Sequence, residues 1–389
     1  MLCWTLLAAA IVWGCLAAFD LAGQRRLFHV GGEELLSDYD TPRMCAAADD
    51  AYHPGVVKDV DACYPPLAYA IVRAFPEGRG GGLLLTGLMT ALFLLALLAI
   101  RRDFLAVSVC ALSAPMLFTI ERGNLVILAA AGVAFFIAFY DSPRKGLRVF
   151  AAFALAAAAA LKITPAVFAV LYLFPSRTSD NELVWRLAMD VRSLLLFATF
   201  SAALFIIPFL FFGGIPDGLV SWFGNAKQNS SEYALATRWG FVALGRAIHH
   251  ALGHDVHSVW RGYAACRVAS ITLGAVCLLA AGRIRWNCVS SPIADSHVVF
   301  LLASSMLLLS PPMHFYTGLY LLPAFVLRIG VLGRLKFDIL EAILWLFMLL
   351  PLQVPFGASS LNTPLVAAAH LVLVVECLLR RTFVSADNE

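Results

Sequence analysis

Residues 149–175 form an apolar run that carries a single charged side chain, Lys162, near its middle. A membrane-spanning helix needs about 20 mainly apolar residues, so a run of this length indicates a chain that enters a bilayer. Pro165 follows three residues after Lys162, and proline removes a backbone donor and disfavours helix at the residue before it. The pattern therefore predicts two short helices with Lys162 at the break between them.

The position of Lys162 calls for an explanation. A lysine at mid-bilayer costs roughly 2.5 to 3.5 kcal/mol on insertion scales, and such residues usually face a cavity, a counter-charge or a bound anion. Alternatively, the side chain extends from the end of a short helix to the membrane interface. We favour the functional interpretation and keep the second one open.

Composition extends this argument to the whole chain. With 61% hydrophobic and 14% charged residues, the sequence is far more apolar than soluble domains, whose apolar share is about 45–50%. We predict an all-α integral membrane bundle of about 11–12 transmembrane helices, two of them half-length. The candidate spans are residues 2–19, 83–100, 104–120, 125–140, 149–161, 163–174, 194–212, 263–281, 298–310, 317–328, 339–350 and 364–379. The chain 1–389 is predicted to be one membrane domain with two long loops, 20–82 and 213–261.

Orientation follows from the basic residues, because short loops rich in Lys and Arg stay cytoplasmic. Such loops occur in every second position along the chain, which predicts that both termini are cytoplasmic and that both long loops are extracytoplasmic. The segment around Arg122, the break at Lys162 and the segment around His314 then open to the same outer side. The net charge of +3 gives no reason to expect a nucleic-acid partner.

The first long loop contains three further features. Cys45 and Cys63 are a candidate disulfide pair, since disulfides persist outside the cytoplasm. The aspartates of this loop lack the regular alternation and the glycine of a calcium loop, so we expect no metal site. Residues 78–82 are rich in glycine but lack the lysine and hydroxyl of a phosphate-binding loop, and we expect a flexible hinge there.

A carboxylate just outside the first span, with Arg122, Lys162 and His314 on the same side, suits transfer of a group from a lipid-anchored phosphate to a hydroxyl. An aspartate would take the acceptor proton as general base. The cations would stabilise charge on the departing phosphate. A transporter or a flippase for lipid-linked sugars is the main alternative, because broken helices also build anion sites in transporters. A membrane assembly subunit without catalysis is the third hypothesis.

Several motifs in this order give the chain a family resemblance. They are Asp38-Tyr39, Asp50-Ala51-Tyr52, Tyr64-Pro65-Pro66-Leu67, Arg122-Gly123-Asn124, Leu161-Lys162-Ile163-Thr164-Pro165, and Ser310-Pro311 with His314 and Tyr316. The chain resembles polytopic glycosyltransferases of the GT-C superfamily, most closely glycosyltransferase family 87. It departs from the family pattern before Asn124, where many members have Gly-Gln and this chain has Arg122-Gly123.

The resemblance implies a GT-C-like bundle whose first extracytoplasmic loop carries the catalytic aspartate. It also implies a polyprenyl-phosphate sugar donor that enters from the bilayer, and inversion at the sugar carbon. Asp38 is the expected base, with Asp40 as the alternative. Arg122, Lys162 and His314 would meet the donor phosphate, while Asn124, Tyr64 and Tyr316 would support the donor or acceptor. We therefore expect a hexosyltransferase, most simply a mannosyltransferase of a bacterial plasma membrane. It would use a glycan or glycolipid acceptor and no cofactor.

Overall fold

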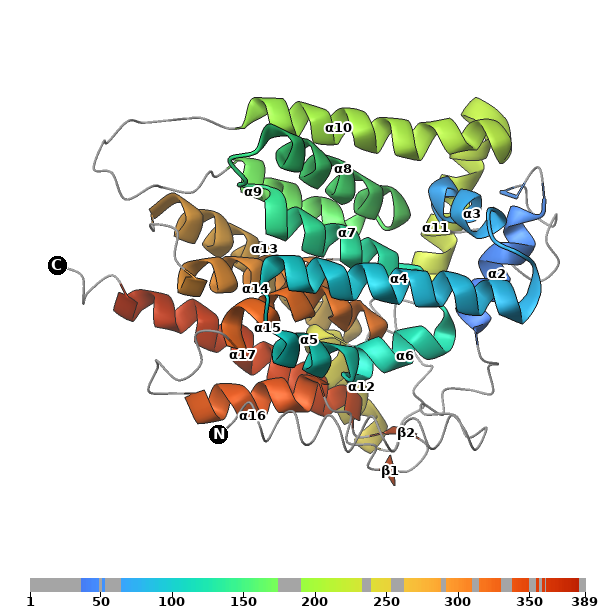
Figure 1. Ribbon diagram of the computed structural model, residues 1–389. Helices are drawn as coiled ribbons and strands as arrows, with labels where there is room; N and C mark the ends of the chain where they lie inside the picture. Colours follow the sequence, from blue (N-terminus) through green and yellow to red (C-terminus); the bar gives the residue numbers. More distant parts are fainter. Residues whose placement is uncertain are drawn as a thin grey trace.

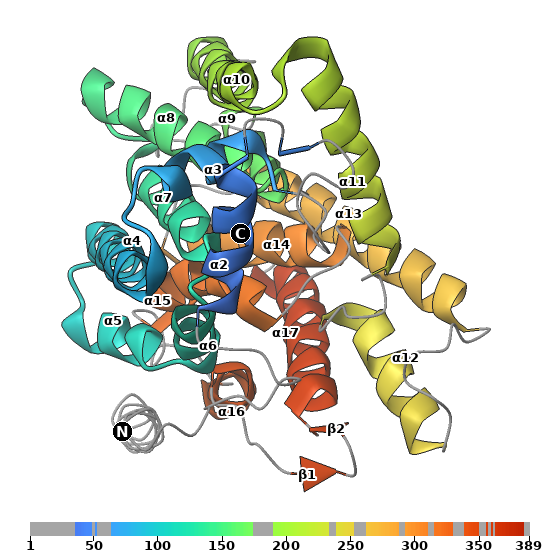
Figure 2. The ribbon, with the colours of Figure 1, turned by 90° about the vertical axis from the view of Figure 1, so that its right-hand side faces the viewer.

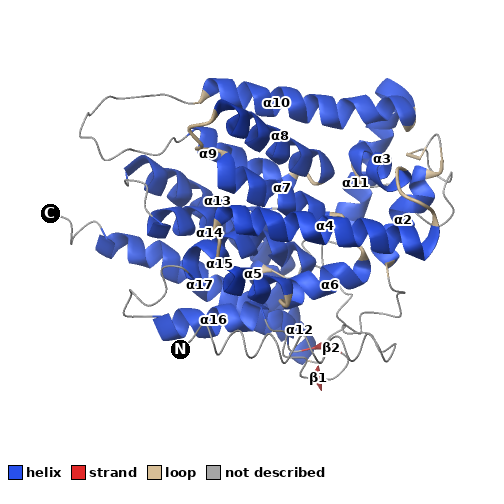
Figure 3. Cartoon of the chain, viewed as in Figure 1, coloured by secondary structure: helices blue, strands red, loops and turns tan. Residues whose placement is uncertain are grey.

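The protein is almost entirely helical in the part of the chain that the structure describes. The computed structural model describes residues 36–48, 51–52, 64–173, 190–232, 239–252, 262–287, 292–309, 315–329, 338–349, 355–356, 359–360 and 362–384. Figure 1 shows long helices lying side by side, and Figure 3 shows how little of the described chain is loop or strand. The two strands, β1 (Pro355–Phe356) and β2 (Ser359–Ser360), form one short antiparallel pair.

The helices follow the chain in this order. The first half contains α2 (Ser37–Ala46), α3 (Pro66–Arg73), α4 (Gly78–Ile100), α5 (Phe104–Ala111), α6 (Ala114–Arg122), α7 (Val126–Phe139), α8 (Lys145–Leu161), η1 (Thr164–Ala169) and α9 (Val170–Leu173). The second half contains α10 (Val191–Ile206), η2 (Ile207–Phe211), η3 (Gly214–Gly218), α11 (Leu219–Glu232), α12 (Gly240–Ala251), α13 (Tyr263–Asn287), α14 (Pro292–Leu309), η5 (Phe315–Leu321), α15 (Leu322–Ile329), α16 (Asp338–Leu349) and α17 (Asn362–Val384).

Three segments of the described chain are long and apolar enough to cross a membrane: Gly78–Ile100, Val191–Phe211 and Tyr263–Trp286. A fourth span is formed if α5 and α6, which are bent by 52° at a short break, count as one. The other apolar helical segments of the described chain have 10–17 residues. These apolar helices indicate an almost entirely helical membrane protein, while the full number of 11–12 spans stays a prediction. The predicted span 2–19 lies outside the described residues.

The bundle is built around α7, whose side chains are mostly buried. In Figure 1, α10, α8, α7 and α4 follow one another as neighbours from the top of the view, and α15 and α17 lie lower. Small residues bring α7 and α8 close together. A Cβ atom on Gly132 would lie 2.5 Å from the carbonyl oxygen of Ala154 and 3.0 Å from the Cβ of Ala158. Since α7 and α8 are antiparallel neighbours, this register puts the end of α8 level with the start of α7.

The predicted break at Lys162 is confirmed. Helix α8 ends at Leu161, and Lys162 takes an extended conformation with φ −147° and ψ 118°. A 3₁₀ helix begins at Thr164, with Pro165 in its first turn, where a missing backbone N–H costs nothing. Proline and the extended lysine thus divide one apolar run into two helical pieces.

The expected glycine hinge is wrong. Residues 78–82 belong to the start of α4, and Gly81 and Gly82 within them are buried, although Gly78 and Gly80 face open space. A Cβ on Gly82 would lie 2.9 Å from side-chain atoms of both Leu36 and Tyr39. Glycine is required here because α2 approaches the backbone of α4 closely.

Candidate active site

The first turn of helix α2 is attached to the end of α6 and to the segment just before α4. Leu36 precedes the helix in a left-handed conformation with φ 67°, and its N–H donates to the carbonyl of Glu121 at 2.9 Å. The hydroxyl of Tyr39, a buried residue, donates to the carbonyl of Pro76 at 2.9 Å. Burial raises the pKa of Tyr39, so this hydroxyl stays protonated and keeps its role as donor. Figure 2 views the end of the bundle where α2 lies against these helices.

This attachment brings Asp38 to the junction between α6 and α7. Arg122, the last residue of α6, donates from Nε to Oδ2 of Asp38 at 2.9 Å and from Nη2 to Oδ1 at 2.6 Å. Asn124 donates from Nδ2 to Oδ2 at 2.6 Å. Two-pronged contacts of guanidinium with carboxylate fix direction as well as distance. The structure therefore brings together three residues that the sequence predicted for the site: Asp38, Arg122 and Asn124.

The amide of Asn124 is itself fixed in orientation. Asn124 is fully buried, and its Oδ1 accepts a hydrogen bond from the backbone N–H of Val126 at 2.9 Å. With Oδ1 used in this way, Nδ2 is the atom that faces Asp38. Oδ2 of Asp38 consequently accepts two of the described hydrogen bonds and Oδ1 accepts one. The side chain of Asp38 is 15% exposed, so its carboxylate is shielded but not fully enclosed.

Gly123 makes the sharp turn between the two partners of Asp38. It ends α6 with φ 64°, a conformation that favours glycine. A Cβ at this position would also lie 2.9 Å from a methyl carbon of Leu36. The turn thus lets α6 stop at Arg122 and α7 start soon after Asn124 while α2 packs directly on top.

Asp40, the alternative base, lies on the same helix but on another face. Its side chain is exposed, whereas Tyr39 and Asp38 face the bundle. Two residues along an α-helix turn the side chain by about 200°. The geometry therefore favours Asp38 over Asp40 as the residue that faces the α6–α7 junction.

Lys162 contacts the second group of predicted site residues. Its Nζ lies 5.0 Å from the centroid of the Tyr64 ring, a distance typical of a cation–π contact. Tyr64 is held by two hydrogen bonds: its carbonyl accepts from the hydroxyl of Tyr52 at 2.9 Å, and its N–H donates to the hydroxyl of Tyr69 at 3.1 Å. Lys162 is thus an oriented cation at the same level of the bundle as the start of α7.

Helix α3 connects the two groups, because it packs against both α2 and α8. The helix η5 packs against α6 and α7, and a Cβ on Gly318 would lie 3.2 Å from Pro115 of α6. His314, which precedes η5, lies outside the described residues, as does the side chain of Tyr316. Their predicted roles stay predictions.

The predicted disulfide pair is described for one of its two cysteines only. Cys45 is buried in α2, but Cys63 lies outside the described residues, so their pairing stays a prediction. In the described part of the chain, no group of three or more His, Cys, Asp or Glu side chains is arranged to hold a metal ion.

Comparison with known proteins gives one family. The sequence pattern of glycosyltransferase family 87 matches residues 63–311, more than half of the 389-residue chain. The chain belongs to glycosyltransferase family 87. No curated protein and no solved structure matches the chain significantly. Membership of family 87 confirms the resemblance drawn from the motifs and makes this chain a membrane glycosyltransferase.

The family 87 match begins after Asp38, so the structure adds information that the match does not contain. Arg122-Gly123, where the chain departs from the family pattern, supplies the two-pronged contact to Asp38 and the turn beside it. Sequence reasoning assigned Arg122 to the donor phosphate and did not pair it with Asp38. It also did not identify Leu36 and Tyr39 as the residues that place α2, because their contacts lie far away in the sequence.

Proposed function

We propose that this glycosyltransferase transfers a hexose, most simply mannose, from a polyprenyl-phosphate donor to a hydroxyl of a glycan or glycolipid. The observation that carries the proposal is the carboxylate of Asp38, held by Arg122 and Asn124 at the α6–α7 junction. An oriented carboxylate that is still partly exposed suits a general base. The distribution of Lys and Arg supports an extracytoplasmic active site and cytoplasmic termini.

The reaction proceeds by direct displacement. Oδ1 of Asp38 takes the proton of the acceptor hydroxyl while the acceptor oxygen forms a bond to the anomeric carbon. The bond between that carbon and the phosphate oxygen breaks on the opposite face, and its electron pair leaves with the polyprenyl phosphate. Attack from the face opposite the leaving group inverts the configuration of the sugar carbon.

Lys162 has the properties needed on the side of the leaving group. A cation near the phosphate stabilises the negative charge that develops as the bond breaks, and lysine is a common phosphate ligand. Tyr64 holds the Lys162 ammonium in place through its ring. In this proposal His314 adds a second contact to the phosphate, and no cofactor or metal ion takes part.

Arg122 has two possible tasks in this scheme, and the contacts favour one. Its guanidinium uses Nε and Nη2 on Asp38, so its main task is to orient the base. Contact with the donor phosphate would be left to the N–H groups that do not donate to Asp38, chiefly those of Nη1. We therefore assign the donor phosphate chiefly to Lys162.

The test is transfer of labelled mannose from a polyprenyl-phosphate-mannose donor by the full chain in lipid nanodiscs, with a panel of glycan and glycolipid acceptors. Asp38→Asn is compared with Asp40→Asn, a matched control on the exposed face of the same helix. We expect transfer to be lost in Asp38→Asn, with donor binding retained, and to persist in Asp40→Asn. Equal activity of Asp38→Asn and wild type would exclude Asp38 as the base. Failure of the wild type to bind or use this donor would refute the proposed donor.

A further inference from the structure

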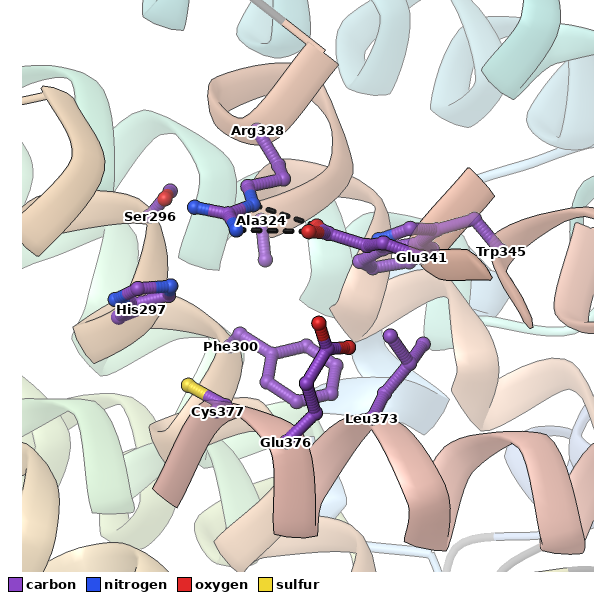
Figure 4. Close-up of a pocket in the computed structure, with 10 residues that line it drawn as sticks. All are labelled: Ser296, His297, Phe300, Ala324, Arg328, Glu341, Trp345, Leu373, Glu376 and Cys377. Carbon is purple, nitrogen blue, oxygen red and sulfur yellow. Dashed lines mark hydrogen bonds and ion pairs between the residues drawn. The ribbon is translucent and has the colours of Figure 1, made fainter. Parts of the chain in front are cut away.

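The pocket between α14, α15, α16 and α17 is filled almost entirely by the protein itself. Figure 4 shows Arg328 of α15 paired with both carboxylate oxygens of Glu341 of α16. The free space in this pocket is about 20 Å³, which is room for a single water molecule. The ion pair therefore serves to join two helices rather than to bind a ligand.

At the other end of the bundle, helix α11 belongs to the second long loop predicted from the sequence, to which the proposed reaction gives no task. Figures 1 and 2 show α11 at the same end as α2 and α3. Trp222 of α11 is 3% exposed, and its ring contacts that of Phe205 of α10, with centroids 5.1 Å apart. Asn225, one turn further along, is 9% exposed and donates from Nδ2 to the carbonyl of Tyr52 at 3.2 Å. Helix α11 is therefore attached both to α10 and to the first long loop.

Tyr52 links Asn225 to Tyr64. It is fully buried, and its ring contacts those of Tyr69 in α3 and Phe209 in η2, with centroids 5.5 and 5.4 Å apart. Its hydroxyl donates to the carbonyl of Tyr64 at 2.9 Å. The carbonyl and the hydroxyl of one buried tyrosine thus connect Asn225 of the second loop to Tyr64 of the first.

The ammonium of Lys162 lies at the end of this series of contacts. A lysine ammonium is carried on a flexible four-carbon chain, so its position depends on the groups that it contacts. The Tyr64 ring, with its centroid 5.0 Å from Nζ, is one such group. The ring can hold the ammonium in one place only if Tyr64 is itself fixed, and the hydrogen bonds to Tyr52 and Tyr69 fix it.

Burial gives these hydrogen bonds their weight. Tyr52 belongs to an apolar cluster that is separate from the main core and draws residues from α2, the first loop, α3, η2 and α11. Little water reaches such a cluster, so a buried carbonyl in it depends on protein donors. The carbonyl of Tyr52 accepts from Asn225, and that of Tyr64 accepts from the Tyr52 hydroxyl. Removal of either hydrogen-bond donor would therefore weaken the hold on Tyr64.

We propose that Asn225 and the hydroxyl of Tyr52 position the ammonium of Lys162 through Tyr64. The proposal rests on the assignment of Lys162 to the donor phosphate in the proposed function. Asn225 and Tyr52 are positioning residues, because they act on the sugar donor through Tyr64 and Lys162. The second long loop thereby takes part in binding of the sugar donor, although it contributes no group to the displacement itself.

The first experiment measures sugar-donor binding and transfer by the full chain in lipid nanodiscs, with a polyprenyl-phosphate-mannose donor. Tyr52→Phe and Asn225→Asp each remove one hydrogen-bond donor and nearly keep the size of the side chain. Gln228→Glu makes the same amide-to-acid change at an exposed position of α11. We expect the first two changes to weaken sugar-donor binding about two- to tenfold, the effect of one hydrogen bond between neutral groups, with the acceptor KM and the Gln228→Glu variant unaffected. In a Lys162→Met background, Tyr52→Phe and Asn225→Asp should have no further effect.

The second experiment reads the position of Lys162 without any sugar donor. The full chain is treated briefly with acetic anhydride, and labelling of Lys162 is measured by peptide mass spectrometry relative to Lys145, which is exposed at the other end of α8. Labelling of Lys162 should rise about twofold or more in Tyr52→Phe and Asn225→Asp, because a side chain released from the ring is more accessible to the reagent. It should stay at the wild-type level in Gln228→Glu.

The outcomes separate this inference from the proposed function. Unchanged labelling of Lys162 in both variants would overturn the inference, whatever the sugar donor is. A loss of sugar-donor binding that is equally large in the Lys162→Met background would also overturn it, since this would show a general effect on the fold. If the wild type does not use this sugar donor but labelling of Lys162 rises as expected, the proposed donor is wrong and the positioning of Lys162 stands. Tyr52→Phe loses a single oxygen atom, so the test holds even if Asn225→Asp does not fold.

Discussion

Replacement of Arg122 by lysine separates the two tasks that an arginine at this position can have. The wild-type guanidinium makes two hydrogen bonds to Asp38, at 2.9 and 2.6 Å, in a planar fork. A lysine ammonium keeps the positive charge but lacks the fork, so it replaces one of these bonds at most. The pair is largely shielded, with side-chain exposures of 18% and 15%, so little of this loss is compensated by water.

The expected magnitude follows from the lost hydrogen bond. A hydrogen bond to a charged group contributes about 1.5–3 kcal/mol. Since each 1.36 kcal/mol corresponds to a factor of ten in rate, Arg122→Lys should lower kcat by roughly 10- to 150-fold. Donor affinity should stay near the wild-type value, because the variant still carries a cation and Lys162 is unchanged.

The assay is steady-state transfer of labelled sugar in nanodiscs, with donor binding measured separately. A double-mutant comparison adds a second criterion: if Arg122 acts through Asp38, the change Arg122→Lys should cost little in the Asp38→Asn background. The opposite pattern, with weakened donor binding, unchanged kcat and full additivity, would refute the positioning role. It would return Arg122 to the donor phosphate.

Three further predictions concern the surroundings of the site. Gly123→Ala should destabilise the protein by about 1–2 kcal/mol or more, because alanine is strained in the left-handed conformation and its Cβ would collide with Leu36 at the start of α2. Thermal unfolding would show this as a lowered Tm, and an unchanged Tm would contradict the tight packing. Tyr64→Leu removes the ring that contacts Lys162 and should weaken donor binding by several-fold, as expected for a cation–π contact of about 0.5–2 kcal/mol. Tyr64→Phe keeps the ring and should bind the donor as the wild type does. Equal effects of the two changes on donor binding would exclude the ring contact. Tyr39→Phe loses one hydrogen bond and should cost about 0.5–1.5 kcal/mol. Burial raises the pKa of Tyr39 above its ordinary 10.0, so the stabilisation from its hydroxyl is complete below pH 10 and is lost as the pH rises further. The measured stabilities of the wild type and Tyr39→Phe should therefore converge only in strongly alkaline solution.

Local features of the chain were predictable from the sequence. Pro165 and the lone charge at Lys162 predict a break in the apolar run, and α8 ends one residue before the lysine. The spans predicted near residues 83–100 and 263–281 correspond to α4 and α13. These predictions succeed because proline and long apolar runs act over a few residues, without help from distant parts of the chain.

The contacts that form the site were harder to predict, since they depend on packing between distant segments. Asp38 and Arg122 are 84 residues apart, and no local pattern relates them. The glycines at 78–82 illustrate the same difficulty. In isolation they suggest flexibility, whereas in the fold Gly82 makes room for Tyr39. Sequence reasoning could name both partners of Asp38, but only the packing of α2 against α6 shows what they do together.

The place of Asp38 in the chain affects how similar enzymes should be sought. The family pattern covers residues 63–311, so a search based on it selects chains by their shared bundle and leaves out α2. If Asp38 is the base, two chains that match the pattern equally well can differ in whether they have a base at all. An aspartate on an upstream helix, together with a partner for it at the α6–α7 junction, would then distinguish working transferases from relatives that keep the architecture but not the chemistry.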